Sequence, residues 1–188
     1  MKTKLFSIVL VLALAGCARG NLVNPNSVVE DGIEYYLQTD KYIYDLGENV
    51  QMLYRVSNLT GSPVDIGEVL GSGEDLSANF VITQDDNTDI WEFLRVLPPA
   101  GWAMFHLEPG ESRELQITWD MISDNGTFFN PDDDYRVGQG SYNIMAELIL
   151  SNAYRDRSVP VSVSIEVIPE PSTLLLFGLG ALLLRKQN

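Results

Sequence analysis

Alternating apolar and polar residues predict β-strands through the middle of the chain. The segments 161–167 and 115–119 alternate with a period of two, as a strand does when it buries one face. The segment 50–56 alternates in the same way except at Leu53, which is apolar at a position where the pattern requires a polar residue. Similar patterns, clear in the first and weaker in the others, occupy 142–150, 33–39, 64–69, 78–83, 90–95 and 102–107.

Clusters of Gly, Pro, Asp and Asn separate these segments, for example Asp45-Leu46-Gly47 and Pro109-Gly110. No stretch between 30 and 168 sustains a helical period. About nine strands at this spacing predict one all-β domain over 33–168, an antiparallel β-sandwich. The strand pattern places several residues in its core, with Trp91 and Trp119 beside them: Tyr54, Leu115, Ile117, Ile144, Val163 and Ile165.

The first 17 residues have the order of a secretory signal peptide. Two lysines precede an apolar run over 5–14, which suits such a signal and is shorter than the roughly 20 apolar residues of a membrane-spanning helix. Two processing sites remain open. Leu-Ala-Gly-Cys at 14–17 resembles a lipobox, in which Cys17 becomes the lipidated first residue; alternatively, Ala-Leu-Ala at 13–15 is an ordinary cleavage site. Signal peptidase is an expected partner in both cases, and 18–32 is expected to be a linker.

The last residues, 169–188, place three features in order. They are Pro169-Glu170-Pro171, an apolar run over 174–184 and the basic pair Arg185-Lys186, and basic residues after an apolar segment stay on the cytoplasmic side of a membrane. This order resembles the PEP-CTERM tail of exported bacterial proteins. The resemblance implies that an exosortase-type membrane protease recognises Pro169, Glu170 and Pro171, while a short apolar helix holds the tail in the membrane. The run is about half of a full span, so crossing would need neighbouring residues and local thinning of the bilayer.

Charge narrows the set of partners. The chain of 188 residues has a net charge of −14 and a single Cys, which excludes an internal disulfide framework. Four of the twelve basic residues lie in residues 1–17 and 172–188, which hold no acid, so residues 18–171 have a net charge of −18. A nucleic-acid-binding protein needs a basic stripe, and the sequence has none. With a net charge of −18, the domain is expected to be soluble and to repel anionic lipid and nucleic acid.

The region between the two ends shows no catalytic or metal-binding motif. The single histidine, His106, has no Cys or Asp close to it in the sequence, so neither a zinc site nor a nucleophile triad is predicted around it. The acidic run over 85–89 has the odd spacing of a calcium loop, but Ile90 and Val96 stand where such a loop needs Gly and Glu. A hairpin turn explains this run better. We therefore expect no enzyme, no metal and no cofactor.

The segment 120–139 has no clear period, and loops of this length in a compact domain are usually functional or disordered. Its aromatic and acidic residues could contact a cationic partner or a divalent ion, or could fold back on the sandwich as a plain insertion. The candidate interaction residues are Phe128, Phe129, Asp132, Asp133, Asp134 and Tyr135.

Four stretches in the middle of the chain resemble the BsuPI family, named for a bacterial intracellular proteinase inhibitor. They are the strand and its lead-in over 47–58, the pair of strands with an acidic turn over 80–91, Leu-Glu-Pro-Gly-Glu-Ser at 107–112 leading to Trp119, and Gly-Ser-Tyr at 140–142. The resemblance covers 33–150. It implies an antiparallel immunoglobulin-like sandwich and, for the founding member, proteinase inhibition. No inhibitory loop can be matched residue by residue.

These observations favour an exported, non-catalytic binding or structural protein of the cell envelope or the extracellular space. The two ends of the chain specify its location, while no motif in the middle specifies a reaction. Extracellular polysaccharide or a protease is the expected partner, and proteinase inhibition of the BsuPI type is the alternative function.

Overall fold

A computed structural model describes residues 24–70, 76–84, 88–94, 101–123, 135–154 and 157–169. Eleven β-strands and no helix lie within this part of the chain, which confirms the all-β class. The signal peptide with Cys17, the tail from Glu170 onward and most of the predicted interaction loop lie outside it. No helix of the described residues is long and apolar enough to cross a membrane. The apolar run 174–184 is not among them.

The strands form two sheets and a two-stranded ribbon. The first sheet has the order β1 (Asn24–Glu30), β2 (Ile33–Thr39), β4 (Val50–Asn58), β9 (Ser112–Trp119). The second has the order β3 (Ile43–Asp45), β11 (Val161–Ile168), β10 (Gly140–Leu148), β6 (Ala78–Gln84), β7 (Asp89–Leu94). The ribbon pairs β5 (Val64–Leu70) with β8 (Trp102–Leu107). All neighbours are antiparallel except β3 and β11, which are parallel.

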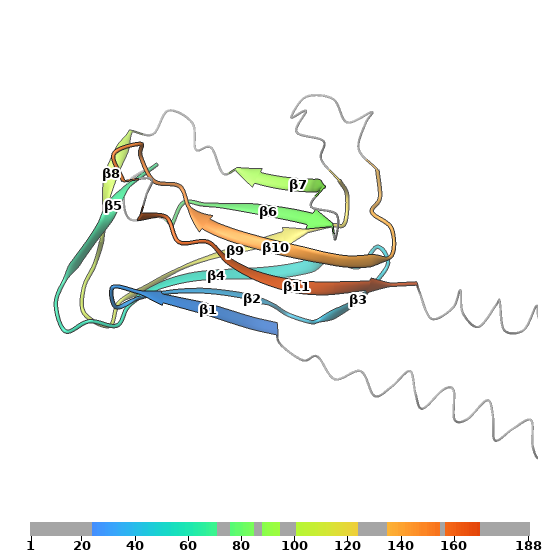
Figure 1. The fold of residues 1–188 in the computed structure, drawn as a ribbon, viewed down its shortest axis with the longest axis horizontal. Coiled ribbons are helices and arrows are strands. Elements are labelled where there is room, and N and C mark those ends of the chain that lie inside the picture. The colour runs from blue at the N-terminus through green and yellow to red at the C-terminus, as the bar shows by residue number, and fades with distance from the viewer. Residues whose placement is uncertain are drawn as a thin grey trace, which may run out of the picture.

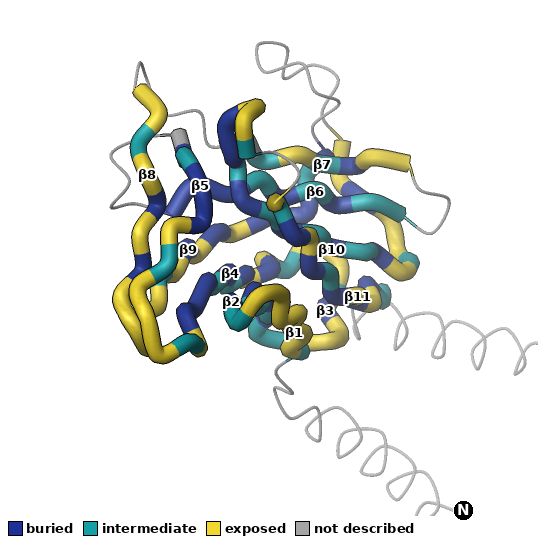
Figure 2. The backbone as a smooth tube through the Cα atoms, turned by 60° about the vertical axis from the view of Figure 1, so that its left-hand side comes forward, coloured by how far each residue is buried: buried dark blue, intermediate teal, exposed yellow. Residues whose placement is uncertain are grey.

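The two sheets pack face to face around a single apolar core (Figure 1). The Tyr54 ring of the first sheet meets Phe80 of the second edge to face, with centroids 6.1 Å apart, and Trp119 meets Tyr142 at 5.8 Å. Burial alternates along β2, β4, β9, β10 and β11, as the period of two predicted (Figure 2). Every residue of the predicted core set is buried: Tyr54, Leu115, Ile117, Ile144, Val163 and Ile165.

The two tryptophans expected in the core differ in burial. Trp119 is fully buried, and its indole N–H donates to the carbonyl of Ile122 at 2.9 Å. Trp91 is half-buried on β7, where it packs against the edge of the core and stacks on Phe93 with centroids 5.7 Å apart. Only the first is a full core residue.

The linker expected over 18–32 is wrong in its second half, because Asn24–Glu30 forms strand β1. Asp31 and Gly32 connect β1 to β2 with φ angles of 51° and 80°, the conformation of a two-residue type I′ hairpin turn. The amides of Asn24 and Asn26 donate to the carbonyls of Ser164 and Ser162 at 2.7 Å each. These bonds join β1 to β11, so that β1 links the two sheets along one side.

Strand β3 is the second element that the alternation did not predict. It is three residues long, and the turn predicted at Asp45-Leu46-Gly47 does follow it, with Gly47 at a φ of +83°. Tyr44 is fully buried, and its hydroxyl donates to Asp40 at 2.7 Å. Burial and this hydrogen bond raise the pKa of Tyr44 far above its ordinary value.

The chain enters and leaves the sandwich at the same end. Because Asn24 contacts Ser164 and Asn26 contacts Ser162, β1 runs antiparallel to β11, and its first residue lies four residues before the last residue of β11. Figure 1 shows β11 ending at the right of the molecule and the β5–β8 ribbon at the opposite, left end.

Candidate functional site

The sorting motif begins directly where the sandwich ends. Val167, the second-last residue of β11, is buried and pairs with Gly140. Ile168 pairs with Asp45 on β3, and its carbonyl accepts the backbone N–H of Leu46 at 2.9 Å. Pro169, which follows, is partly buried and belongs to no strand. Since proline has no N–H to donate to a ladder, the sheet ends there. Glu170 and Pro171 lie outside the described residues.

Of the six predicted interaction residues only Tyr135 is described, and it is exposed. Phe128, Phe129, Asp132, Asp133 and Asp134 fall in the segment 124–134, which the structure does not describe. The residues on either side of that segment bind each other. The N–H of Ser123 donates to the carbonyl of Tyr135 at 2.8 Å, and the N–H of Val137 donates to Met121 at 3.0 Å.

These paired flanks lie at the end of the sandwich from which the tail leaves. A Cβ at Gly47 would be only 2.9 Å from Nη1 of Arg136, so Arg136 lies against the turn that follows β3. The same turn binds Ile168 through Leu46. The structure therefore brings the stem of the predicted loop against the turn that binds Ile168, the last strand residue before the tail, and five of the six candidate residues lie outside its described part.

The acidic run at 85–89 lies between two paired strands, as the hairpin interpretation expected. β6 ends at Gln84 and β7 begins at Asp89, and the two strands pair antiparallel. Residues 85–87 are outside the described part of the chain. Within the described part, no group of three or more His, Cys, Asp or Glu side chains is arranged to hold a metal ion.

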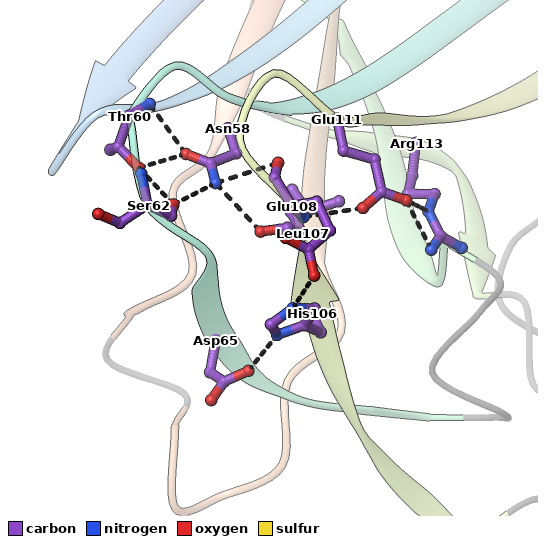
Figure 3. A network of polar contacts seen from close by, with 9 residues as sticks. All are labelled: Asn58, Thr60, Ser62, Asp65, His106, Leu107, Glu108, Glu111 and Arg113. Carbon is purple, nitrogen blue, oxygen red and sulfur yellow. Dashed lines mark hydrogen bonds and ion pairs between the residues drawn. The ribbon is translucent and has the colours of Figure 1, made fainter.

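His106 has carboxylate partners that its sequence neighbourhood did not reveal. Strand pairing places Asp65 of β5 opposite His106 of β8, and their side chains meet at 2.7 Å through Nδ1 (Figure 3). The other ring nitrogen, Nε2, lies 3.2 Å from a carboxylate oxygen of Glu108. His106 has no Asp close to it in the sequence, but the fold supplies one from β5. The two partners are 41 residues apart in the chain, and only the register of the ribbon brings them together.

The carboxylates favour the charged form of His106. The hydrogen bond to Asp65, followed by that to Glu108, raises the pKa of the imidazole above its ordinary value. Both ring nitrogens face carboxylates, and no nucleophile among the described residues is bound to the imidazole. This cluster joins β5 to the β8–β9 turn and does not form a triad.

A second polar cluster, centred on Asn58, lies beside the histidine (Figure 3). The side chain of Asn58 is fully buried at the end of β4. Its Nδ2 donates to the carbonyls of Ser62, Leu107 and Glu108 at 2.9, 3.0 and 3.2 Å. Its Oδ1 accepts the N–H and the hydroxyl of Thr60 at 2.9 and 2.7 Å. One side chain thus fastens the turn after β4 to the end of β8.

In the turn between β8 and β9, Glu111 is the next acid after Glu108, and it is also held in place. The N–H of Glu108 and the guanidinium of Arg113 both donate to its carboxylate at 2.8 Å. These two partners, the backbone N–H first, lower the pKa of Glu111. One signal for this region is visible in the sequence, an Asn at a strand end before a Thr-Gly-Ser-Pro turn, but the carbonyls that Asn58 binds are not.

Comparison with known proteins identifies the tail. Residues 167–187 match the family model described as the PEP-CTERM protein-sorting motif. The chain therefore has the signal of an exported protein that an exosortase sorts. The match includes Val167 and Ile168, the last two residues of β11. No curated protein matches the chain.

Several solved structures are similar to the chain at low identity. The C-terminal domain of Wzt is 12% identical, with a TM-score of 0.44, over 78% of this chain and 79% of that one. A β-glucosidase from Erythrobacter marinus is 14% identical, with a TM-score of 0.42, and one from Listeria innocua is 8% identical, with 0.38. Each of these two matches covers 78% of this chain and only 16% of the β-glucosidase. Likeness at this level identifies neither an activity nor a ligand.

Proposed function

We propose that the chain is an exported, non-catalytic binding or structural β-sandwich protein of the cell envelope or the extracellular space. The observation that supports this most directly is the PEP-CTERM motif, which starts inside the last strand of the sandwich. Domain and sorting signal are therefore continuous. Signal peptidase and an exosortase are the processing partners, and the tail holds the chain at the membrane before it is cut.

The sandwich is of the immunoglobulin-like type in this proposal. Its support is the strand order, with β2-β4-β9 in one sheet and β11-β10-β6 in the other, and β3 lying parallel to β11 at the edge. The same order agrees with the BsuPI resemblance. Proteinase inhibition has no supporting loop or contact among the described residues, so it does not enter the proposal.

A non-catalytic role is supported by how the ionisable side chains are used. His106 and Glu111 are bound by Asp65, Glu108 and Arg113, and these contacts join strands and turns. General acid–base catalysis needs a group that can take up and release a proton near pH 7 within reach of substrate. The partners of these two side chains are carboxylates, a backbone N–H and a guanidinium, and no nucleophile is among them.

Substitution of Glu170 tests the sorting function. We expect Glu170→Ala to leave the full-length protein uncut in the membrane fraction of a host that has an exosortase, and deletion of 169–188 to release a folded domain into the periplasm or the medium. Glu166→Ala is the matched control, because Glu166 is an exposed acid four residues upstream on β11. Cell fractionation with intact-mass measurement gives the result. If Glu170→Ala is processed like the parent, the motif is not the sorting signal. The same mass spectra distinguish a lipidated Cys17 from cleavage after Ala15.

A further inference from the structure

The outer face of the β2–β4–β9 sheet has a shallow hollow that the sorting function leaves unexplained. It has a volume of about 270 Å³ and is lined by Gln38, Asp40, Gln51, Met52, Leu53 and Gln116. Pockets for drug-sized ligands measure about 300–1,000 Å³, so this hollow suits one small unit of a larger molecule.

Strand register places the lining residues in rows. Gln38, Leu53 and Gln116 are direct cross-strand neighbours on β2, β4 and β9. Adjacent strands are about 4.8 Å apart, so the two glutamines flank Leu53 at a separation of about 10 Å between their strands. Leu53 is the apolar residue that broke the alternation of β4, and it is only partly buried. It forms an apolar floor between two amides.

The side-chain amides of Gln38 and Gln51 are held through their oxygens, so their NH₂ groups remain as hydrogen-bond donors. Oε1 of Gln38 accepts the hydroxyl of Tyr36, and Oε1 of Gln51 accepts the hydroxyl of Thr118 at 2.8 Å. Their Nε2 groups, and the whole side-chain amide of Gln116, have no partner among the residues that the structure describes. A primary amide offers both donors and an acceptor. The hollow therefore presents several neutral hydrogen-bonding groups around one apolar contact.

The charged groups around the hollow already have partners within the domain. The guanidinium of Arg55 lies 3.3 Å from Glu34 and 4.0 Å from Glu114, and it stacks 4.4 Å above the ring of Tyr36. Oδ1 of Asp40 accepts the Tyr44 hydroxyl at 2.7 Å and the N–H of Gln51 at 3.0 Å. Among the described residues no unpaired cation lies beside the hollow to attract an anion, and Asp40, the acid in its lining, already accepts two hydrogen bonds. The chemistry favours a neutral ligand.

We infer that this hollow binds one unit of a neutral, hydroxyl-rich polymer, namely an uncharged polysaccharide outside the cell. Hydroxyl groups pair with amides, which both donate and accept, and the C–H face of a sugar ring packs against an apolar residue such as Leu53. The domain's net charge of −18 would repel an anionic polymer. The inference rests on the proposed function, since only an exported binding protein meets such a polymer.

Binding of the purified mature protein to defined polymers tests this. The probes are a neutral β-glucan, a neutral α-glucan and a galactomannan, with alginate and polylysine as charged comparators, measured by affinity electrophoresis and calorimetry. We expect binding to at least one neutral polymer. The double variant Gln38→Ala/Gln116→Ala should weaken it about tenfold, because two side-chain hydrogen bonds are lost. Gln139→Ala is the matched control, an exposed glutamine outside the hollow, and should stay within about twofold of the parent.

A second variant keeps the amides and removes the apolar floor. Leu53→Gln should also weaken binding to the neutral polymer, while circular dichroism and thermal unfolding check that the variants stay folded. Binding to none of the neutral polymers, binding only to alginate or polylysine, or neutral binding that survives the double variant would overturn the inference. Sorting is measured on the same variants. Normal sorting without polymer binding rejects the hollow alone, and the proposed sorting function fails only if Glu170→Ala is processed normally.

Discussion

Removal of the Asn58 side chain is predicted to destabilise the domain more than any other single change at its surface turns. Asn58→Ala deletes the bonds to three carbonyls and to two donor groups of Thr60. The NH₂ group has two hydrogens for three acceptors, so we count four full hydrogen bonds, each with a net contribution of about 0.5–1.5 kcal/mol. The carbonyl of Leu107, whose bond to Asn58 is buried, would also lose a partner.

We therefore expect a loss of about 4 kcal/mol in the free energy of unfolding. That is a large share of the roughly 5–15 kcal/mol by which a domain is stable. For a domain of this size it corresponds to a fall in Tm of about 8–16 °C. Asn58→Asp should be at least as harmful at neutral pH, because the new carboxylate would face carbonyl oxygens, and milder near pH 4, where a protonated carboxyl can donate.

Urea and thermal unfolding of the purified protein measure these changes. Asn143→Ala is the matched control, since this asparagine is only partly buried on β10 and its side chain has no hydrogen bond within the described residues. It should change the stability by less than about 1 kcal/mol. The reasoning is refuted if Asn58→Ala behaves like the control, because the cluster would then contribute nothing to joining the two turns.

Three further changes probe other parts of the fold. Gly32→Ala should cost about 1–2 kcal/mol in urea unfolding, because φ is +80° and the new Cβ would lie 2.5 Å from Cγ2 of Thr60; an unchanged midpoint would contradict the turn geometry. Ile144→Ala should cost about 2–5 kcal/mol in the same assay, since the side chain is fully buried between the sheets, and a smaller loss would mean that the core collapses around the gap. His106 has a pKa raised above 6.5, so its contribution to stability is present below pH 6.5 and is lost as the pH rises through the raised value. Tm measured from pH 6 to 9 should therefore fall slightly in the parent and not in His106→Gln, and equal slopes would show that the carboxylate contacts do not act on stability.

The sequence predicted nine of the strands because each buries one face, and burial of one face leaves a period of two. It did not predict β1, whose residues are nearly all exposed and include Pro25. It did not predict β3, because three residues are too few to show a period. Both strands also contact β11, far along the chain, β3 by strand pairing and β1 through Asn24 and Asn26. Contacts at this separation have no local signature, although Asp31-Gly32 is a hairpin signal between β1 and its neighbour β2.

The same distinction separates the parts of the candidate site. The sorting motif could be found from sequence because its recognition elements are consecutive residues. The contact between His106 and Asp65 could not, since a register irregularity between Asp65 and Gly67 decides which side chain lies opposite the histidine. Leu53 was visible as an exception in its strand, but its glutamine neighbours come from two other strands.

The shared position of the two chain ends also determines how the domain would carry a mechanical load. Tension on the N-terminal side enters at Asn24, beside Ser164, and tension on the tail enters after Ile168, four residues further along β11, so both enter neighbouring antiparallel strands from the same direction. A tether at either point, or at both, pulls in the same direction, so no stretching force passes between them through the core. The load is drag on the body of the domain. It runs along β1 and β11 and acts on their ladders in shear, where several hydrogen bonds must break at once. Such an arrangement resists unzipping.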